Sequence, residues 1–311
     1  MLHLRLVVPA EKVGAVLDCL SSSPAVTNVV HLPGAALEPA GDLVLGDVAR
    51  EAASEVLETL KGHDLVRLGS ISADEVSLSL SDAARAAEQA APGLGTDAVV
   101  WEEVEARTTE ESTLSATYLV FMCVATMIAA FGLLLDQPIL VVGAMVVGPE
   151  FGPLAGLCVA IVQRRPAEAR RSLLALVVGF PVGMLATIAL VLLLTATGQL
   201  DSSMLTADRP DTSFIYHPDS LSFIVAFLAG IAGMLSLTSA KSGALVGVLI
   251  SVTTIPAAAN VAAGIAYGNA HEAAGSAVQL GLNLGGIVLA GTLTLVVQQH
   301  AWHRAPATPA T

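Results

Sequence analysis

The sequence predicts a polytopic α-helical membrane protein of about six spans, preceded by a small soluble α+β domain. Of its 311 residues, 54% are hydrophobic and only 13% are charged, whereas about 25% of the residues of an ordinary soluble domain are charged. The charge is also uneven: residues 1–113 hold 7 Lys and Arg against 19 Asp and Glu, and residues 114–311 hold 7 against 8. Six apolar segments follow residue 114, each close to the roughly twenty residues that a spanning helix needs.

The first eighty residues alternate between strand and helix patterns. Strands are indicated by LHLRLVV, AVTNVVHL, GDLVLGDVA and the stretch 65–80, and amphipathic helices by AEKVGAVLDCLSSS and REAASEVLETLKGH. This βαββαβ order predicts a ferredoxin-like domain over residues 1–80, with two helices on one face of a four-stranded antiparallel sheet. The N-terminus lacks the features of a secretory signal, so we expect this domain to stay in the cytoplasm.

Residues 81–113 are predicted to be a linker that ends in an acidic helix leading into the membrane, and residues 300–311 a short tail. Between them, the transmembrane domain covers residues 114–299. The predicted spans lie at about 116–135, 138–162, 172–197, 221–239, 243–266 and 274–298.

Loop charges predict the orientation of these spans. The loop after the second span, QRRPAEARR, carries four arginines, which are expected to fix the topology and to meet lipid headgroups: Arg164, Arg165, Arg170 and Arg171. The positive-inside rule makes this loop cytoplasmic. Loop 198–220, with one Arg against four Asp, is then outside. Both termini are expected in the cytoplasm, and the protein in the inner membrane.

Two of the predicted spans are interrupted near their middle by proline, glycine and polar residues. The second span contains VVGAMVVGPEFGPLAG (141–156), and the fifth contains GALVGVLISVTTIPAAAN (243–260). Backbone exposed to lipid must satisfy its own hydrogen bonds, so each break must be covered by protein or line a wet cavity. Because the middle span of each triplet is broken, the six spans predict a 3+3 inverted repeat whose broken helices meet near the midplane.

The breaks define a candidate ion or solute site. Glu150 lies about twelve residues, or about 18 Å, into the second span, where a charged side chain costs about 2.5 kcal/mol or more. It is a candidate proton or cation carrier, and the alternative is a carboxylate solvated in a re-entrant loop. The full predicted site comprises Gly148, Pro149, Glu150, Gly152, Pro153, Thr253, Thr254, Pro256, Asn260 and Asn283. For its hydroxyl and amide groups the alternative is hydrogen bonding between helices, which is also what we expect of Ser251 and Gln279.

These motifs resemble those of a known family. The stretches GLLLDQPILVVGAMVVGPEFGPLAG and FIVAFLAGIAGMLSLTSAKSGALVGVLISVTTIPAAAN, with Asn283, resemble the bacterial uncharacterised hydrophobic domain family, domain of unknown function 389, over most of residues 110–298. The resemblance implies an integral membrane protein without an assigned reaction. The chain departs from the family pattern at Gly148 and Glu150, where the family more often has a serine and an apolar residue, and at Ile255, where it tends towards a second proline.

Composition and motifs also exclude several classes of function. The acidic balance argues against nucleic acid as a partner, and the three scattered cysteines predict neither disulfides nor a zinc site. Neither GxSxG, HExxH, a Walker loop nor CxxC occurs, so we expect no enzyme, cofactor or metal site. The glycines spaced along the spans predict close helix packing and a homo-oligomer in the lipid bilayer. The sequence thus predicts a secondary transporter or channel for a small ion or polar solute. The alternative is a membrane sensor or scaffold whose cytoplasmic domain binds a ligand or partner.

Overall fold

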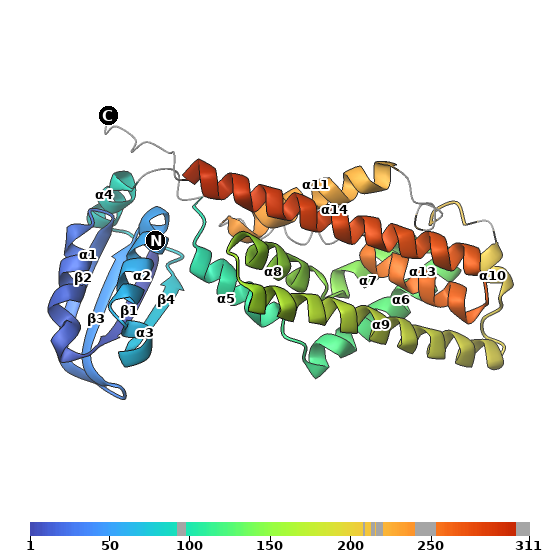
Figure 1. Ribbon diagram of the computed structural model, residues 1–311, viewed down its shortest axis with the longest axis horizontal. Coiled ribbons are helices and arrows are strands. Elements are labelled where there is room, and N and C mark those ends of the chain that lie inside the picture. Colours follow the sequence, from blue (N-terminus) through green and yellow to red (C-terminus); the bar gives the residue numbers. More distant parts are fainter. Residues whose placement is uncertain (92–97, 208, 213–214, 216–219, 240–252, 303–311) are drawn as a thin grey trace. The chain divides into compact units, whose positions relative to one another are not determined.

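The computed structural model describes residues 1–91, 98–207, 209–212, 215, 220–239 and 253–302 (Figure 1). The chain divides into two compact units. Met1–Glu103 form the body of the first unit, and the second comprises the described residues of Val104–Leu237 and Lys241–Gln299.

The first unit is built on an antiparallel sheet of four strands in the order β2-β3-β1-β4. The strands are β1 (Leu2–Val8), β2 (Val26–Leu37), β3 (Ala40–Val48) and β4 (Ser70–Glu75), and the helices between them are η1 (Ala10–Lys12), α1 (Val13–Ser22), α2 (Arg50–Gly62) and α3 (Leu65–Leu68). Successive side chains of a strand point to opposite faces, and in β1 the alternate residues Leu2, Leu4, Leu6 and Val8 are buried. They share one core with α1 and α2, so the observed order of the main elements is the predicted βαββαβ.

Two details of this unit differ from the sequence prediction. The stretch 65–80, predicted as one strand, begins instead with the short helix α3, and β4 follows as only six residues. The segment predicted as a linker contains helix α4 (Asp82–Ala90), whose first turn is capped by Ser81 Oγ accepting from the Ala84 N–H at 3.3 Å. The predicted acidic helix is present as α5 (Trp101–Glu111).

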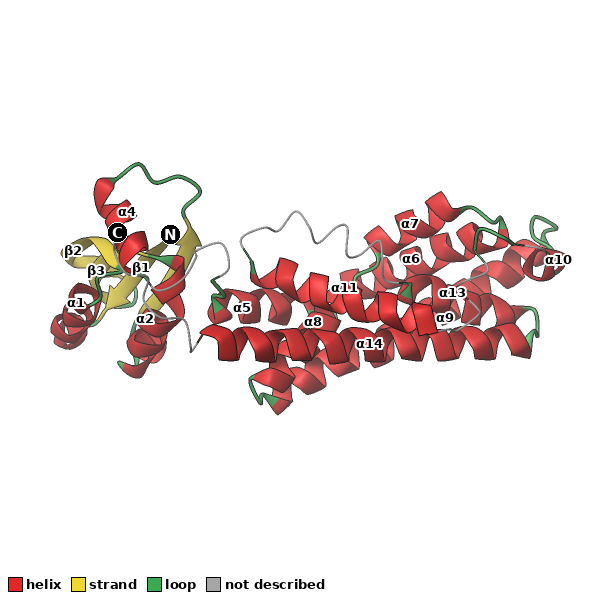
Figure 2. Cartoon of the chain, turned by 90° about the horizontal axis from the view of Figure 1, so that it is seen from above, coloured by secondary structure: helices red, strands yellow, loops and turns green. Residues whose placement is uncertain are grey.

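The second unit is helical, and Figure 2 shows its helices running along a common direction. Its helices are α6 (Ala116–Leu134), α7 (Pro138–Val147), α8 (Phe151–Val162), α9 (Pro166–Ala196), α10 (Ser203–Thr206), α11 (Ser220–Thr238), α13 (Thr254–Ala266) and α14 (Ala270–Trp302). Among the described residues, four helices are long and apolar enough to cross a membrane, or five if α7 and α8, bent by 51°, form one broken span. The predicted six are not confirmed, because residues 240–252 of the fifth predicted span lie outside the described residues.

Close helix contacts in this unit depend on glycine. A Cβ added at Gly230 of α11 would lie 2.8 Å from the Ile287 carbonyl oxygen and 2.9 Å from the Ala290 Cβ, both on α14. A Cβ added at Gly183 of α9 would lie 3.1 Å from the Met122 carbonyl oxygen of α6. Small residues let helix backbones approach in this way. The predicted packing role therefore holds at Gly230, whereas Gly281 and Gly285, for which it was also predicted, have no atom within 4 Å of an added Cβ.

This packing gives a testable prediction. Gly230→Ala should lower the free energy of unfolding by about 1–3 kcal/mol, because the new methyl group meets backbone that cannot move aside. Gly281→Ala, also on a long helix but with no atom within 4 Å of its added Cβ, should be neutral or stabilising by up to about 1 kcal/mol through helix propensity. Thermal unfolding of the detergent-solubilised variants measures both, and equal loss in the two would contradict the assigned contact.

Candidate functional site

The first helix break occupies Gly148, Pro149 and Glu150 between α7 and α8. Gly148 has φ −63° and ψ 129°, the extended conformation that a proline favours in the residue before it. Pro149 has no N–H, so it cannot donate the helical hydrogen bond to the Met145 carbonyl. Pro153 is the third residue of α8, where a helix N–H has no intrahelical acceptor in any case. The local sequence therefore ends α7 and starts α8 at this point.

Helix α13 begins with the same pattern as α8. Thr253 is the capping residue of α13 and Pro256 is its third residue, as Glu150 and Pro153 are for α8. The first backbone bonds correspond as well: the Leu154 N–H donates to the Glu150 carbonyl at 3.2 Å, and the Ala257 N–H donates to the Thr253 carbonyl at 3.3 Å. Ser251 and the rest of the predicted second break before Thr253 lie outside the described residues.

Side chains from these two helix starts and from α14 form two hydrogen-bonded sets, which meet at the neighbouring residues Thr253 and Thr254. Thr254 Oγ1 donates to Glu150 Oε1 at 2.7 Å, and Asn283 Nδ2 donates to Thr253 Oγ1 at 2.7 Å. Gln279 Nε2 in turn donates to Asn283 Oδ1 at 3.4 Å. We call Glu150, Thr253, Thr254, Gln279 and Asn283 the break cluster. Gln279, expected to be structural, is thus part of the candidate site.

The break cluster is buried and short of hydrogen-bond donors. The exposed fraction is 2% for Glu150, 1% for Gln279 and 2% for Asn283. Within the described part of the chain, Glu150 Oε2 and Gln279 Oε1 have no hydrogen-bond partner. Burying a carboxylate is costly unless it is paired and hydrogen-bonded. Glu150 is therefore a costly side chain to bury, because only one of its two carboxylate oxygens is hydrogen-bonded within the described part of the chain.

Gly148 makes room for the Glu150 carboxylate. A Cβ added at Gly148 would lie 2.7 Å from Ile255 Cγ1 and would overlap Glu150 Oε2. The glycine therefore lets the start of α13 approach the first break.

An open cleft of about 310 Å³ reaches the first break from the junction of α5 and α6. Its lining combines acidic, hydroxyl and aromatic side chains with the break itself: Glu110, Glu111, Thr113, Ser115, Thr117, Tyr118, Phe121, Gly148, Pro149, Phe151 and Gly152. Polar residues line its α5 end, and Gly148 and Pro149 lie next to Glu150 at its other end. The cleft brings solvent-accessible space to within one residue of the buried carboxylate.

Comparisons with known proteins agree with the motifs around the break. Residues 145–289 match the family described as Domain of unknown function (DUF389). The matched residues include all five residues of the break cluster, and the resemblance predicted from the sequence is confirmed over this part of the chain.

Among curated proteins, the uncharacterized protein MJ0678 of Methanocaldococcus jannaschii is similar to this chain. It is 27% identical over 158 residues, which are 51% of this chain and 47% of the relative. The match therefore spans about half the length of that relative. No solved structure matches the chain.

Gly152, predicted as part of the site, packs closely against α5. An added Cβ there would lie 2.5 Å from Glu111 Cβ, and one at Gly156 would lie 2.8 Å from Ser172 Oγ. Ser112 Oγ donates to the Gly152 carbonyl at 3.5 Å. Gly152 and Gly156 are spaced four residues apart, so both face α5 and the start of α9 and not the break cluster.

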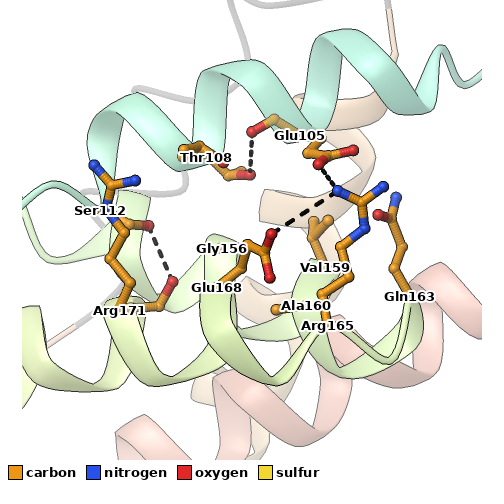
Figure 3. A pocket seen from close by; sticks show the side chains of 12 residues that line it. Glu105, Thr108, Ser112, Gly156, Val159, Ala160, Gln163, Arg165, Glu168 and Arg171 are labelled. Atoms are coloured by element: carbon orange, nitrogen blue, oxygen red, sulfur yellow. Dashed lines mark hydrogen bonds and ion pairs between the residues drawn. The ribbon is translucent and has the colours of Figure 1, made fainter. Parts of the chain in front are cut away.

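The four arginines between the end of α8 and the first turns of α9, Arg164, Arg165, Arg170 and Arg171, are all exposed. Arg165 forms ion pairs with Glu105 of α5 and, at 4.0 Å, with Glu168 (Figure 3), and Arg171 Nη2 donates to Thr113 Oγ1 at 2.5 Å. Two of the four therefore also contact α5 and the residues that follow it. The pocket among these residues measures about 20 Å³, room for about one water molecule.

Asn260 belongs to a second buried group, which we call the cap cluster: Arg209, Asn260, Glu272 and Ser276. Arg209 Nη2 pairs with Glu272 Oε2 at 2.6 Å, and Asn260 Nδ2 donates to Ser276 Oγ at 2.8 Å. Asn260 also accepts from Arg209 Nη1 at 3.4 Å. Asn260, predicted as part of the break site, thus bonds within the cap cluster, and six residues of helix place it about 9 Å along α13 from Thr254.

The cap cluster anchors the loop after α9. Arg209 is only 2% exposed, and beyond it Thr212 Oγ1 donates to Asp136 Oδ1 at the end of α6, at 2.8 Å. Leu200 and Leu205 pack in a small apolar core with Leu134, Val191 and Ala263. In the helical unit, α10 lies at the end opposite α5 (Figures 1 and 2). The loop thus closes that end of the domain.

Sequence reasoning missed both Arg209, which it counted as a loop charge, and Glu272, which it did not single out. One signal was present for Glu272. Asn269 and Glu272 form a capping box at the start of α14, in which the Glu272 N–H donates to Asn269 Oδ1 at 3.2 Å and Asn269 Nδ2 donates to Glu272 Oε1 at 3.4 Å. The sequence around Glu272 thus predicts the start of a helix, but no pattern near Arg209 predicts that its side chain is buried.

The cap cluster gives a stability prediction. Glu272→Ala should lower the free energy of unfolding by about 3 kcal/mol or more, because it leaves the Arg209 guanidinium buried without its carboxylate. Asp211→Asn, at an exposed position of the same loop, is the control and should change stability by less than about 0.5 kcal/mol. Thermal unfolding in detergent distinguishes the two, and an unchanged midpoint for Glu272→Ala would show that the pair is not buried.

Proposed function

We propose that the protein is a membrane transporter or channel that moves a small ion or polar solute through the break cluster. The observation that carries this proposal is Glu150, a buried carboxylate with one oxygen unpartnered in the described part of the chain, at the meeting point of two helix starts. Ionisable side chains inside membranes are expensive, and they mark ion pathways and binding sites more often than structural contacts. Several apolar helices around it suggest membrane insertion.

A 3+3 inverted repeat is supported by helix lengths. In the first half α6, α8 and α9 have 19, 12 and 31 residues, and in the second half α11, α13 and α14 have 19, 13 and 33. Corresponding helices begin at Ala116 and Ser220, at Phe151 and Thr254, and at Pro166 and Ala270, which are 104, 103 and 104 residues apart. A constant offset across three helices is the signature of a duplicated unit, and transporters commonly place their site between two such units.

The short helix of each proposed half also contacts helices of the other half. Helix α13 of the second half packs against α6 and α9 of the first. Helix α8 of the first half contacts α14 of the second, where Cys158 Sγ donates to the Val288 carbonyl at 3.6 Å. The two helix starts therefore lie between the halves, where a site opened by relative movement of the halves would be placed.

A cleft approaches Gly148 from the α5 end. In the described part of the loop after α9, Leu200, Leu205 and Arg209 pack against the helical unit at its opposite end. We propose that the α5 end is cytoplasmic, as the arginines after α8 indicate, and that both termini are cytoplasmic with the protein in the inner membrane. The protein is proposed to act as a homo-oligomer and to catalyse no chemical reaction. If it transports nothing, the alternative function is that of a membrane sensor or scaffold.

Glu150→Gln tests the proposed transport. Purified protein in liposomes should move protons or monovalent cations, read with a pH-sensitive dye and with ion flux, and the variant should lose about tenfold or more of this flux because charge at the site is removed. Flux by wild type that Glu150→Gln leaves unchanged would remove this residue from the mechanism. The absence of flux for every ion and polar solute tried, with folded protein in the vesicles, would favour the sensor or scaffold.

Gly148→Ala is a second test, on the backbone of the same break. Its methyl group would displace the Glu150 carboxylate and crowd Ile255, so flux should fall by several-fold at similar expression. Gly143→Ala, one turn earlier in α7 with no atom within 4 Å of the added Cβ, is the matched control and should keep wild-type flux. Equal flux in the two variants would argue that the carboxylate position does not matter.

A further inference from the structure

We propose that the break cluster binds a dehydrated monovalent alkali-metal cation, with Glu150 as its charged ligand. This inference rests on the proposed function, because it names the class of solute that the same site holds. Four features of the site carry it: the kind of atoms left unpartnered, the proline in each helix start, the backbone carbonyls freed at the break, and the charge balance.

The unpartnered atoms of the break cluster are both oxygens. Glu150 Oε2 and Gln279 Oε1 lack a hydrogen-bond partner among the described residues, and both can only accept when Glu150 is ionised. The cluster therefore lacks donors or positive charge and has acceptors to spare. No described Lys, Arg or His forms an ion pair with Glu150. A bare cation beside Glu150 Oε2 would supply the missing positive charge, and hard cations prefer oxygen ligands.

The helix starts favour this cation over an anion. Two N-termini that meet usually attract an anion through their free N–H groups. Here Pro153 and Pro256 each remove one of those donors from α8 and α13, and the Glu150 carboxylate already occupies the meeting point. A second anion would be repelled at close range in a medium of low dielectric.

Backbone carbonyls at the break are also freed from helical bonding. In a continuous helix the carbonyls of Met145 and Pro149 would accept from the residues four positions later, which here are Pro149 and Pro153. These oxygens are therefore available in the same segment as Glu150. Interrupted helices of transporters coordinate sodium or protons with carbonyls freed in this way.

Charge balance sets the valence of the ion. The described break cluster holds a single carboxylate among neutral hydroxyl and amide groups. One monovalent cation makes the site neutral, whereas a divalent ion would leave an uncompensated charge buried among apolar helices. Calcium sites also use several carboxylates.

The test is cation-dependent thermal stability of the full chain in detergent, which needs no transport. Sodium, potassium or lithium chloride is exchanged for N-methyl-D-glucamine chloride at constant ionic strength. In wild type, at least one alkali cation should raise the unfolding midpoint in a saturable way, since a ligand that binds only the folded state stabilises it. Glu150→Gln should lose the shift and, without alkali cation, should be at least as stable as wild type because no charge is buried.

Glu168→Gln is the matched control, because it removes a half-exposed carboxylate of the same helical unit and should keep the cation-dependent shift. If Glu150→Gln does not fold, Thr254→Val provides the second variant, since it removes the hydroxyl that positions the carboxylate and should weaken the shift. A wild-type midpoint that is the same in every alkali cation and in N-methyl-D-glucamine would overturn the inference, as would a shift that Glu150→Gln retains.

The stability and liposome results together separate the two proposals. A Glu150-dependent shift without flux would uphold the cation site and overturn the transport function. Flux without any alkali-cation shift would uphold transport and overturn the cation, leaving another solute at the site.

Discussion

The structure of the helical unit depends on how a broken apolar helix satisfies its polar groups away from water. Between α7 and α8 the chain loses helical hydrogen bonds at Pro149 and Pro153 and adds a buried carboxylate at Glu150. Each unsatisfied group in such surroundings costs several kcal/mol. The Thr254 hydroxyl at the start of α13 donates a hydrogen bond to one oxygen of this carboxylate. The other oxygen, Glu150 Oε2, has no partner among the described residues, and this is the observation that supports a function.

The two buried polar clusters show why this deficit is informative. The cap cluster also buries a carboxylate, Glu272, but pairs it with Arg209 and adds the Asn260 amide. Such a charge-balanced network holds a loop in place. The break cluster, in contrast, gives the Glu150 carboxylate only hydroxyl and amide neighbours, and among the described residues Glu150 Oε2 and Gln279 Oε1 lack a hydrogen-bond partner. A cluster that the described chain does not complete is better suited to a solute that comes and goes than to a purely structural role.

The family match places this contrast in a wider context. It spans residues 145–289, which include both predicted breaks. The resemblance implies an apolar residue where this chain has Glu150. The proposed site therefore rests on a residue of this chain and not on the resemblance.

The sequence by itself determined the elements that local chemistry controls. Composition placed a membrane domain after an acidic soluble one, and periodicity indicated the βαββαβ order. The proline and glycine run 148–153 predicted a break at Glu150, because proline removes a helical donor wherever it stands. The starts of α6 and α11, of α8 and α13, and of α9 and α14 lie 103 to 104 residues apart, which the helix bounds make visible.

Only the tertiary structure decided which of these polar residues meet. It joined Glu150 to Thr254, 104 positions later, and brought Gln279 into the same cluster. It assigned Asn260 to Arg209, and it turned Gly152 towards α5. The reason is physical: local patterns specify where a helix begins and ends. Contacts between helices depend on how distant surfaces pack, and one turn along a helix moves a side chain by about 5.4 Å.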